Sequence, residues 1–232
     1  MMKIIAILAI LFTTGTVLTF SSYSRINRVV SPVTVINSFP APLSDMKAQT
    51  EDIIENVSKK NWEKVIQDLK MITSDWSTFQ PQAVMDGIAP AILDSLSLTV
   101  VNLHKTCNSQ DIFAATEAAN DLSGAVVDLF CFYHSVVPVD IEYLNILERQ
   151  ILLDVQMRNW NATEQALLIL SDVWRRIEPF FIEQIGYSLA NKFSESMKNL
   201  YDAFKIKDSM AIQLETQNGL KIIDELKMEK SL

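Results

Sequence analysis

The chain has 232 residues, of which 49% are hydrophobic and only five are glycine, and its formal net charge at pH 7 is −8. This length and apolar content suffice for a sizeable core, and the scarcity of glycine favours helix over sheet. The 20 cationic residues stand among 28 acidic ones. Nucleic-acid binding needs a concentrated basic face, so the composition argues against nucleic acid as a partner.

An apolar run begins after Lys3 and continues without a charged residue to Phe20. A run of about 17 residues suits the core of an export signal and is at the lower limit for a membrane-spanning helix. Ser22 and Ser24 are small residues in a cleavage-like spacing, so residues 1–24 are either a signal peptide or a membrane anchor. Both alternatives predict an extracytoplasmic protein, attached to the cell membrane or secreted.

Residues 25–41 mix β-branched residues with prolines, as in Val29–Val35 followed by Pro40. This mixture disfavours a helix and predicts an extended linker between the apolar segment and the folded body.

An internal repeat organises the remaining chain. Trp62, Trp76 and Pro81 recur as Trp160, Trp174 and Pro179, each displaced by 98 positions. The pattern predicts two homologous halves, residues 42–135 and 140–230.

Within each half, apolar residues recur at steps of three and four, which is typical of amphipathic helices. Four such helices with short connections predict antiparallel neighbours and an up-down arrangement. The predicted fold class is therefore all-α, a tandem duplication of a four-helix unit preceded by an N-terminal apolar helix. Whether the halves form one bundle or a bundle pair stays open.

Prolines and capping residues set the expected boundaries in the first half. Pro81 is expected to end the helix that starts after Asn61 and to open the next helix, which Pro90 then kinks. Asn61 is expected to cap the helix that Pro81 ends, and a further helix is expected from Asp111 to about Tyr133.

In the second half, helices are expected over residues 141–158, 161–177, 180–204 and 208–230. Asp140 and Asp208 are expected to cap the first and the last of them, and Asn161–Glu164 has the spacing of a capping box. The apolar stretch Leu122–Val139 contains Asp128, so it predicts a central buried helix rather than a second membrane span.

Two His and two Cys residues form a mirrored pattern that resembles zinc-ligand spacing: His104, Cys107, Cys131 and His134. A continuous helix between the cysteines would separate them by roughly 35 Å, too far for a shared metal or a disulfide. We therefore expect no metal and no cofactor, and Cys131 is expected to be a small buried hydrophobic residue.

Asn120 and Asn218 also lie 98 positions apart, and each shares a helical stripe with apolar residues, so both are expected to point inward. They are either buried amides that fix helix register or polar contacts in a ligand cleft. The tryptophans are expected to be core residues that anchor each repeat, with an aromatic ligand box as the alternative: Trp62, Trp76, Trp160 and Trp174.

The sequence lacks a glycine-rich phosphate loop, a Gly-x-Ser-x-Gly elbow and a His-Glu-x-x-His motif, and it nominates no catalytic residue. It predicts a non-catalytic helical-bundle binding or interaction protein. The expected partners are the membrane, through an uncleaved N-terminal segment, and an unidentified protein or small molecule. The alternative is a bundle that sequesters a small ligand or a metal between its halves.

Overall fold

The structure is a computed structural model that describes residues 40–133 and 136–229, all of which belong to one compact unit. The expectations for residues 1–24, and for the linker up to residue 39, lie outside the described residues. Ala41, which the sequence assigned to the linker, is already the first residue of a helix.

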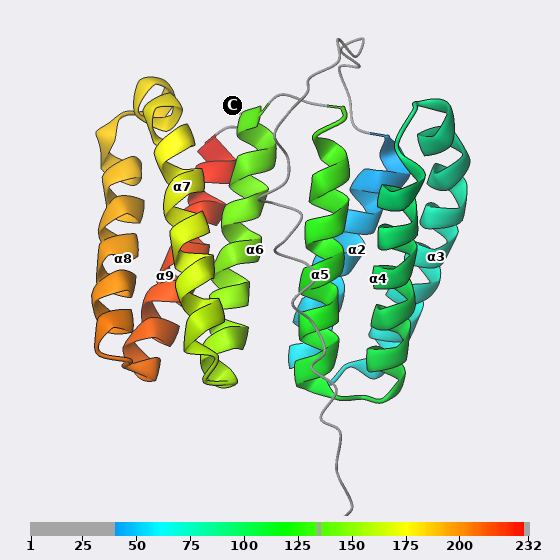
Figure 1. Cartoon of the computed structure of the whole chain (residues 1–232), viewed down its shortest axis with the longest axis horizontal. Helices are drawn as coiled ribbons and strands as arrows, with labels where there is room; N and C mark the ends of the chain where they lie inside the picture. Colours follow the sequence, from blue (N-terminus) through cyan, green and yellow to red (C-terminus); the bar gives the residue numbers. More distant parts are fainter. Residues whose placement is uncertain (1–39, 134–135, 230–232) are drawn as a thin grey trace, which may run out of the picture. The chain divides into compact units, whose positions relative to one another are not determined.

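The described residues form eight α-helices and no strand, which confirms the all-α prediction. The helices are α2 (Ala41–Ser58), α3 (Trp62–Met85), α4 (Pro90–Asn108), α5 (Ile112–Phe130), α6 (Val136–Gln156), α7 (Trp160–Ile185), α8 (Tyr187–Lys205) and α9 (Ser209–Glu229) (Figure 1).

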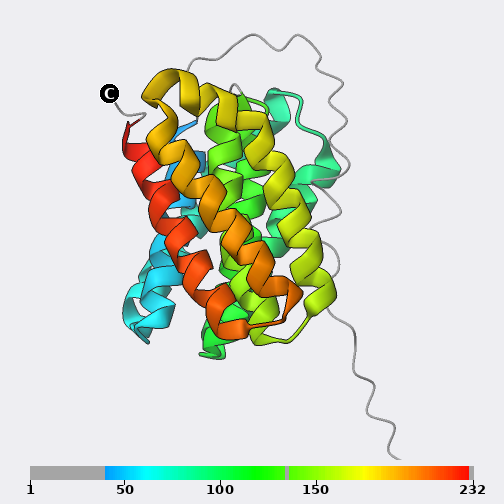
Figure 2. The ribbon, with the colours of Figure 1, turned by 90° about the vertical axis from the view of Figure 1, so that its left-hand side faces the viewer.

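The helices pack as two groups of four. In the first bundle, α2 and α4 each pack against both α3 and α5. In the second bundle, α6 and α8 each pack against both α7 and α9, and Figure 2 shows α8 and α9 running side by side. The bundles meet through α5 and α6, so the described chain forms a bundle pair.

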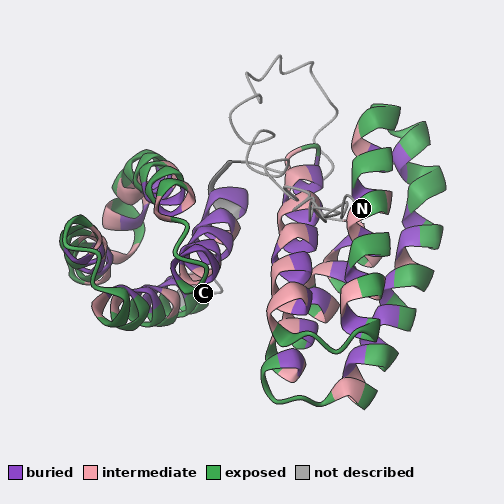
Figure 3. Cartoon of the chain, turned by 60° about the horizontal axis from the view of Figure 1, so that its bottom comes forward, coloured by how far each residue is buried: buried purple, intermediate pink, exposed green. Residues whose placement is uncertain are grey.

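Each helix turns its apolar stripe toward the interior of its bundle. Figure 3 shows buried residues on the inner side of the ring formed by α6–α9 and exposed residues on its outer side. Among the largest fully buried side chains are Phe79 in the first bundle and Phe181 and Phe193 in the second. Burying such stripes is the main source of helical stability in proteins of this size.

The prolines at 81 and 179 do not end helices, contrary to the sequence-based expectation. Pro81 lies inside α3, and Pro179 lies inside α7. An interior proline costs a helix about 3 kcal/mol, but the side chains of Phe79 and Ala83 on either side of Pro81 are almost fully buried. Packing therefore carries α3 past the proline, and Pro90, expected to kink a helix, instead occupies the first turn of α4.

The capping prediction succeeds for Asp208 and is wrong for Asn61, whose side chain makes no cap hydrogen bond to α3. Asp111, predicted only as the start of a helix, is a cap as well. Asp111 accepts a hydrogen bond from the Ala114 amide at 3.0 Å, and Asp208 accepts one from the Ala211 amide at 3.0 Å. Asp140 is not a cap, because it lies inside α6.

The expected capping box at Asn161–Glu164 is also wrong. Asn161 lies inside α7, and the N-cap is Asn159, whose side chain accepts from the Ala162 amide at 3.3 Å.

The stretch Leu122–Val139 is not one buried helix. It contains the end of α5 at Phe130, a turn at Cys131–Tyr133 and the start of α6. Within residues 40–133 and 136–229, none of the helices combines the length and the apolar character needed to cross a membrane.

Four three-residue turns connect the helix pairs α2–α3, α4–α5, α6–α7 and α8–α9. The middle residue of each turn has a positive φ, and none is glycine: Lys60, Gln110, Arg158 and Lys207. The third residue of each turn is Asn or Asp and precedes the next helix. In three of the turns, a backbone hydrogen bond from the amide of this third residue closes a Schellman motif: Asn61 N to Asn56 O, Asn159 N to Asp154 O, and Asp208 N to Ala203 O, at 2.8–3.0 Å.

Candidate functional site

The contact between α5 and α6, which we call the joint, concentrates buried polar side chains from both bundles. The two helices run antiparallel there, because Asn120 contacts Gln150 while Asp128, further along α5, contacts Tyr143, earlier in α6. Polar groups removed from water need partners, so the bonds at the joint indicate what each group does.

Asn120 sits in the middle of the joint, is 1% exposed, and uses its whole amide group. Its Nδ2 donates to the Ile146 carbonyl at 3.2 Å and to Gln150 Oε1 at 3.1 Å. Its Oδ1 accepts from Arg149 Nε at 3.0 Å. Both amide hydrogens are engaged, so Asn120 ties α5 to α6 and offers no free donor to a ligand.

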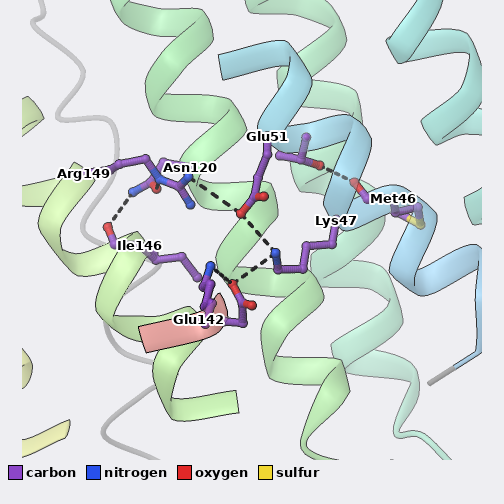
Figure 4. Close-up of polar contacts among 9 residues, drawn as sticks. Met46, Lys47, Glu51, Asn120, Glu142, Ile146 and Arg149 are labelled. Carbon is purple, nitrogen blue, oxygen red and sulfur yellow. Dashed lines mark hydrogen bonds and ion pairs between the residues drawn. The ribbon is translucent and has the colours of Figure 1, made fainter. Parts of the chain in front are cut away.

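Ion pairs extend the joint to α2 and α9 (Figure 4). Glu142 on α6 pairs with Lys47 at 3.0 Å and with Lys227 at 2.8 Å. Arg149 approaches Glu51 at 4.0 Å, and Lys47 also pairs with Glu51 at 3.0 Å. The charges alternate, so the network clamps the two bundles together.

The electrostatics of this network follow from burial and from the opposing charges. Burial alone would lower the pKa of Lys47, but Glu142 and Glu51 offset it and the net pKa is raised. Burial alone would raise the pKa of Glu51, but Lys47, Lys227 and Arg149 offset it and the net pKa is lowered. Both groups therefore stay charged near neutral pH.

Glu148 is a buried carboxyl group in the core of the second bundle. It is 1% exposed, and its Oε2 has no hydrogen-bond partner. Gly219 on α9 makes room for it, because a Cβ at position 219 would stand 2.9 Å from Glu148 Cδ and closer still to Oε1. Burial, with a smaller contribution from Glu215, raises the pKa of Glu148 well above its usual range, so its neutral form is favoured.

Two more acids at the joint have raised pKa values. Burial raises the pKa of Asp128 to about 6, although the hydroxyl of Tyr143 donates to its carboxylate and opposes the shift. Burial raises the pKa of Asp154 to about 6 as well; Gln150 opposes this shift and Glu117 adds to it. Both groups titrate between pH 5 and 7, a range that Asp seldom covers.

Asn218 does not share the position of Asn120. It is exposed on α9, and its Nδ2 lies 3.4 Å from Ser196 Oγ. The expectation that both amides point inward is therefore wrong for Asn218, and the pair does not face a common cleft. The reason is a one-residue change of register: the positive-φ residues Lys60 and Arg158 lie 98 positions apart, but Gln110 and Lys207 lie 97 apart.

The tryptophans divide into two kinds. Trp76 is 8% exposed and Trp174 is 3% exposed, and each lies in the core of its bundle. Trp174 stacks on Phe181, with ring centroids 6.1 Å apart, and meets Phe193 edge to face, with ring centroids 4.7 Å apart. Trp62 and Trp160 are only half-buried, at the first residues of α3 and α7.

The histidine and cysteine pattern is not assembled by the described residues. Cys107 is a buried free thiol near the end of α4, where burial raises its pKa to about 11, and Cys131 is half-buried just after α5. His104 lies 2.8 Å from the Thr73 hydroxyl, and His134 lies outside the described residues. Within the described ranges, no three His, Cys, Asp or Glu residues are arranged to hold a metal ion.

Sequence reasoning missed Glu148, Arg149 and Asp154, yet a signal for them exists. Six of the ten residues from Ile146 to Val155 are apolar, and three of them, Ile151 to Leu153, are consecutive, so the apolar residues cannot all lie on one face of a helix. Such a helix is buried all round, so the charged residues within that run must be buried too. The corresponding helix of the first bundle, α2, has no such run, so this signal indicates buried charged residues in α6 alone of the two.

No protein-family model matches the chain, and no curated protein or solved structure matches it either.

Proposed function

We propose that this chain is a non-catalytic helical-bundle interaction protein that acts outside the cytoplasm, secreted or held at the membrane by its N-terminal segment. One observation carries the non-catalytic part of the proposal. The most concentrated polar cluster among the described residues is committed to internal bonds, since the amide of Asn120 is saturated and Lys47, Glu51, Glu142 and Arg149 neutralise one another. A partner is therefore expected to bind the outer surface.

We further propose that the two bundles arose by internal duplication. The two sets of four helices follow the same order and have the same pattern of neighbours. The ends of α2 and α6, at Ser58 and Gln156, lie 98 positions apart, and so do the starts of α3 and α7, at Trp62 and Trp160. The four turns with a positive-φ middle residue followed by Asn or Asp support the same interpretation.

Export is tested by fusing alkaline phosphatase, which is active only after export, to Leu232 of the full chain. The proposal expects an active fusion that loses activity when residues 1–24 are deleted. A fusion that stays inactive while its protein accumulates would overturn the extracytoplasmic assignment.

A second candidate function, sequestration of a small ligand or a metal between helices, has one observation in its favour. The buried atoms Glu148 Oε2 and Asp154 Oδ2 have no hydrogen-bond partner. Metal analysis and absorbance of the purified full chain discriminate the two candidates. A stoichiometric bound species that is lost in a Glu148→Gln, Asp154→Asn variant supports sequestration, and its absence supports the interaction protein.

A further inference from the structure

The four three-residue turns of the two bundles lie at one end of the helices, which we call the basic end. Within each bundle, the turns after α2 and α4, or after α6 and α8, join helices at the same end because neighbours are antiparallel. Between the bundles, α5 and α6 are antiparallel along their contact, so the start of α5 and the end of α6 lie at that end together. Figure 1 and Figure 2 both show the four turns at the lower ends of the helices.

The twelve turn residues of the basic end hold two more cations than carboxylates, whereas the formal charge of the whole chain is −8. The twelve turn residues include four cations: Lys59, Lys60, Arg158 and Lys207. Their only two carboxylates, Asp111 and Asp208, are engaged in capping the following helices. Lys105 adds a cation in the last turn of α4. Lys59 and Lys205 are paired with Glu55 and Asp202 in the last turns of α2 and α8, so the end relies on Lys60, Arg158 and Lys207 for its charge.

Three of these cations hold a costly backbone conformation. Lys60, Arg158 and Lys207 have φ of 58°, 55° and 54°, a conformation in which a residue with a side chain is less stable than glycine. At the other end the positive-φ residues are glycines, Gly87 with φ 81° and Gly186 with φ 83°. Gly186 combines this φ with a ψ of −179°, a conformation essentially restricted to glycine. The basic end thus retains side chains where glycine would stabilise the fold better.

Favourable interaction with the helix dipoles accounts for only part of this composition. Helices α2, α4, α6 and α8 all end here, and cations are favoured at helix C-termini. That effect does not explain the apolar side chains left in solvent beside the cations. Ile206 is 76% exposed, Met210 is 83% exposed and Met157 is 64% exposed.

Aromatic groups complete the surface in the second bundle. Lys207 Nζ stands 5.7 Å from the centre of the half-buried Trp160 ring, and Lys205 Nζ stands 4.5 Å from the centre of the exposed Tyr201 ring. Exposed apolar tips surrounded by cations and interfacial aromatic rings are the combination that favours the boundary between lipid headgroups and acyl chains. A purely aqueous polyanion would use the cations and leave the apolar tips unexplained.

We propose that the basic end docks on the surface of an anionic lipid bilayer, with Lys60, Arg158 and Lys207 contacting headgroups and Ile206 and Met210 entering the interface. This inference rests on the proposed interaction function and names its partner. Docking is independent of residues 1–39, and it is independent of export in the cell, so the fusion experiment and a vesicle experiment fail separately.

The test uses the purified full chain and its Lys60→Gly, Arg158→Gly, Lys207→Gly variant. Glycine removes each cation and relieves the backbone at the same position, so the variant is expected to melt at the same temperature as the parent or higher. Loss of binding then cannot be attributed to unfolding. The control variant, Lys70→Gln, Lys192→Gln, Lys221→Gln, removes the same charge from exposed helix sides.

Binding is measured by sedimentation with vesicles of phosphatidylcholine alone or mixed equally with phosphatidylglycerol. Each cation near such a surface contributes about fivefold in affinity, so the glycine variant should bind mixed vesicles on the order of a hundredfold more weakly than the parent. The control should lose far less, and 0.5 M salt should remove the difference. Hydrogen exchange of residues 157–159 and 206–208 should slow when mixed vesicles are added.

Several results would overturn the proposal. Equal affinity of parent and glycine variant would do so, and so would equal loss in the control, which would assign the effect to net charge. A parent that binds both vesicle types equally would assign binding to residues 1–39. Absence of binding to mixed vesicles would leave an acidic protein as the better partner for this end.

Discussion

The two bundles place the same helices around different interiors. Thr50 in α2 lies ten residues before Lys60, the positive-φ residue of the next turn, and Glu148 in α6 lies ten residues before Arg158. Leu122 in α5 lies twelve residues after Gln110, the positive-φ residue of the turn before that helix, and Gly219 in α9 lies twelve residues after Lys207. All four positions are buried. The first bundle pairs a small polar side chain with a large apolar one, whereas the second bundle pairs a carboxyl group with glycine.

The two solutions differ in how the polar group is satisfied. Thr50 donates its hydroxyl hydrogen to the Met46 carbonyl at 2.6 Å, within its own helix. Glu148 has no such partner for Oε2, and its carboxyl group depends on the space left by Gly219. The first bundle is therefore built for packing at this level, whereas the second bundle retains a group that costs stability when it is ionised.

Filling the space at Gly219 is expected to have the largest effect of any single change. Gly219→Leu places carbon atoms where the Glu148 carboxyl group stands, and we expect a loss of at least about 3 kcal/mol in the free energy of unfolding. Adding Glu148→Thr recreates the pair of the first bundle and should recover more than half of that loss. Urea denaturation of the two single variants and the double variant measures the coupling.

Gly124 provides the matched control, because nothing lies within 4 Å of a Cβ built there. Gly124→Ala should be neutral or stabilise by up to about 1 kcal/mol, as glycine is a poor helix former. Gly219→Ala should destabilise despite the same gain in helix propensity. Similar effects of the two alanine substitutions would show that Glu148 does not require the space.

The amide at the joint provides the second contrast. Asn120 lies ten residues after Gln110, and Gln217 lies ten residues after Lys207. Asn120→Ala removes the hydrogen bonds that Asn120 makes with Gln150 Oε1 and with Nε of the largely buried Arg149, so we expect a loss of about 2 kcal/mol. Gln217 is exposed, and Gln217→Ala should change stability by less than about 0.5 kcal/mol. Equal small effects in thermal unfolding would remove Asn120 from the joint.

Much of the fold could be predicted from the sequence, because it depends on local patterns. The spacing of apolar residues predicted the helical class, and Asp111 and Asp208 marked helix starts correctly. Pro81 and Pro179 were misleading because tertiary packing outweighs the local cost of proline.

The site was harder to predict, since it depends on pairings between helices. Asn218 was misplaced because four residues, 86–89, separate α3 from α4, whereas Gly186 alone separates α7 from α8, and the register shifts after that point. The pairing of Glu148 with Gly219 joins residues 71 positions apart in sequence, and no local pattern encodes it.

The acids of the joint should make stability depend on pH in a definite direction. The pKa of Asp154 is about 6 in the folded protein, against about 3.9 in an unfolded chain, so the folded state binds the proton more tightly. Its contribution to stability is complete below about pH 3.9 and is lost as the pH rises through 6. Asp128 contributes in the same direction, with its pKa also about 6.

Asp154→Asn removes this dependence while keeping a side chain that Gln150 can bond. At pH 8 we expect the variant to be more stable than the parent by about 1–2 kcal/mol, and at pH 4 the two should differ little. The difference between the urea midpoints of parent and variant is taken at each pH, because the contributions of the other titrating acids to stability cancel in that difference. A difference that grows toward low pH would contradict the assigned direction.

The smallest expected effect concerns one helix N-cap that differs between the two bundles. Asn159 accepts a hydrogen bond from the Ala162 amide at the start of α7, whereas the Asn61 side chain donates to Asn56 Oδ1 instead and leaves the start of α3 without a side-chain cap. Asn159→Ala should therefore cost about 1 kcal/mol, or about 2–4 °C in melting temperature for a chain of this size. Asn61→Ala should cost less than half as much, since it loses only an exposed bond between side chains. Equal losses would mean that the two turns are capped alike in solution, and the difference between the bundles would then be confined to their interiors.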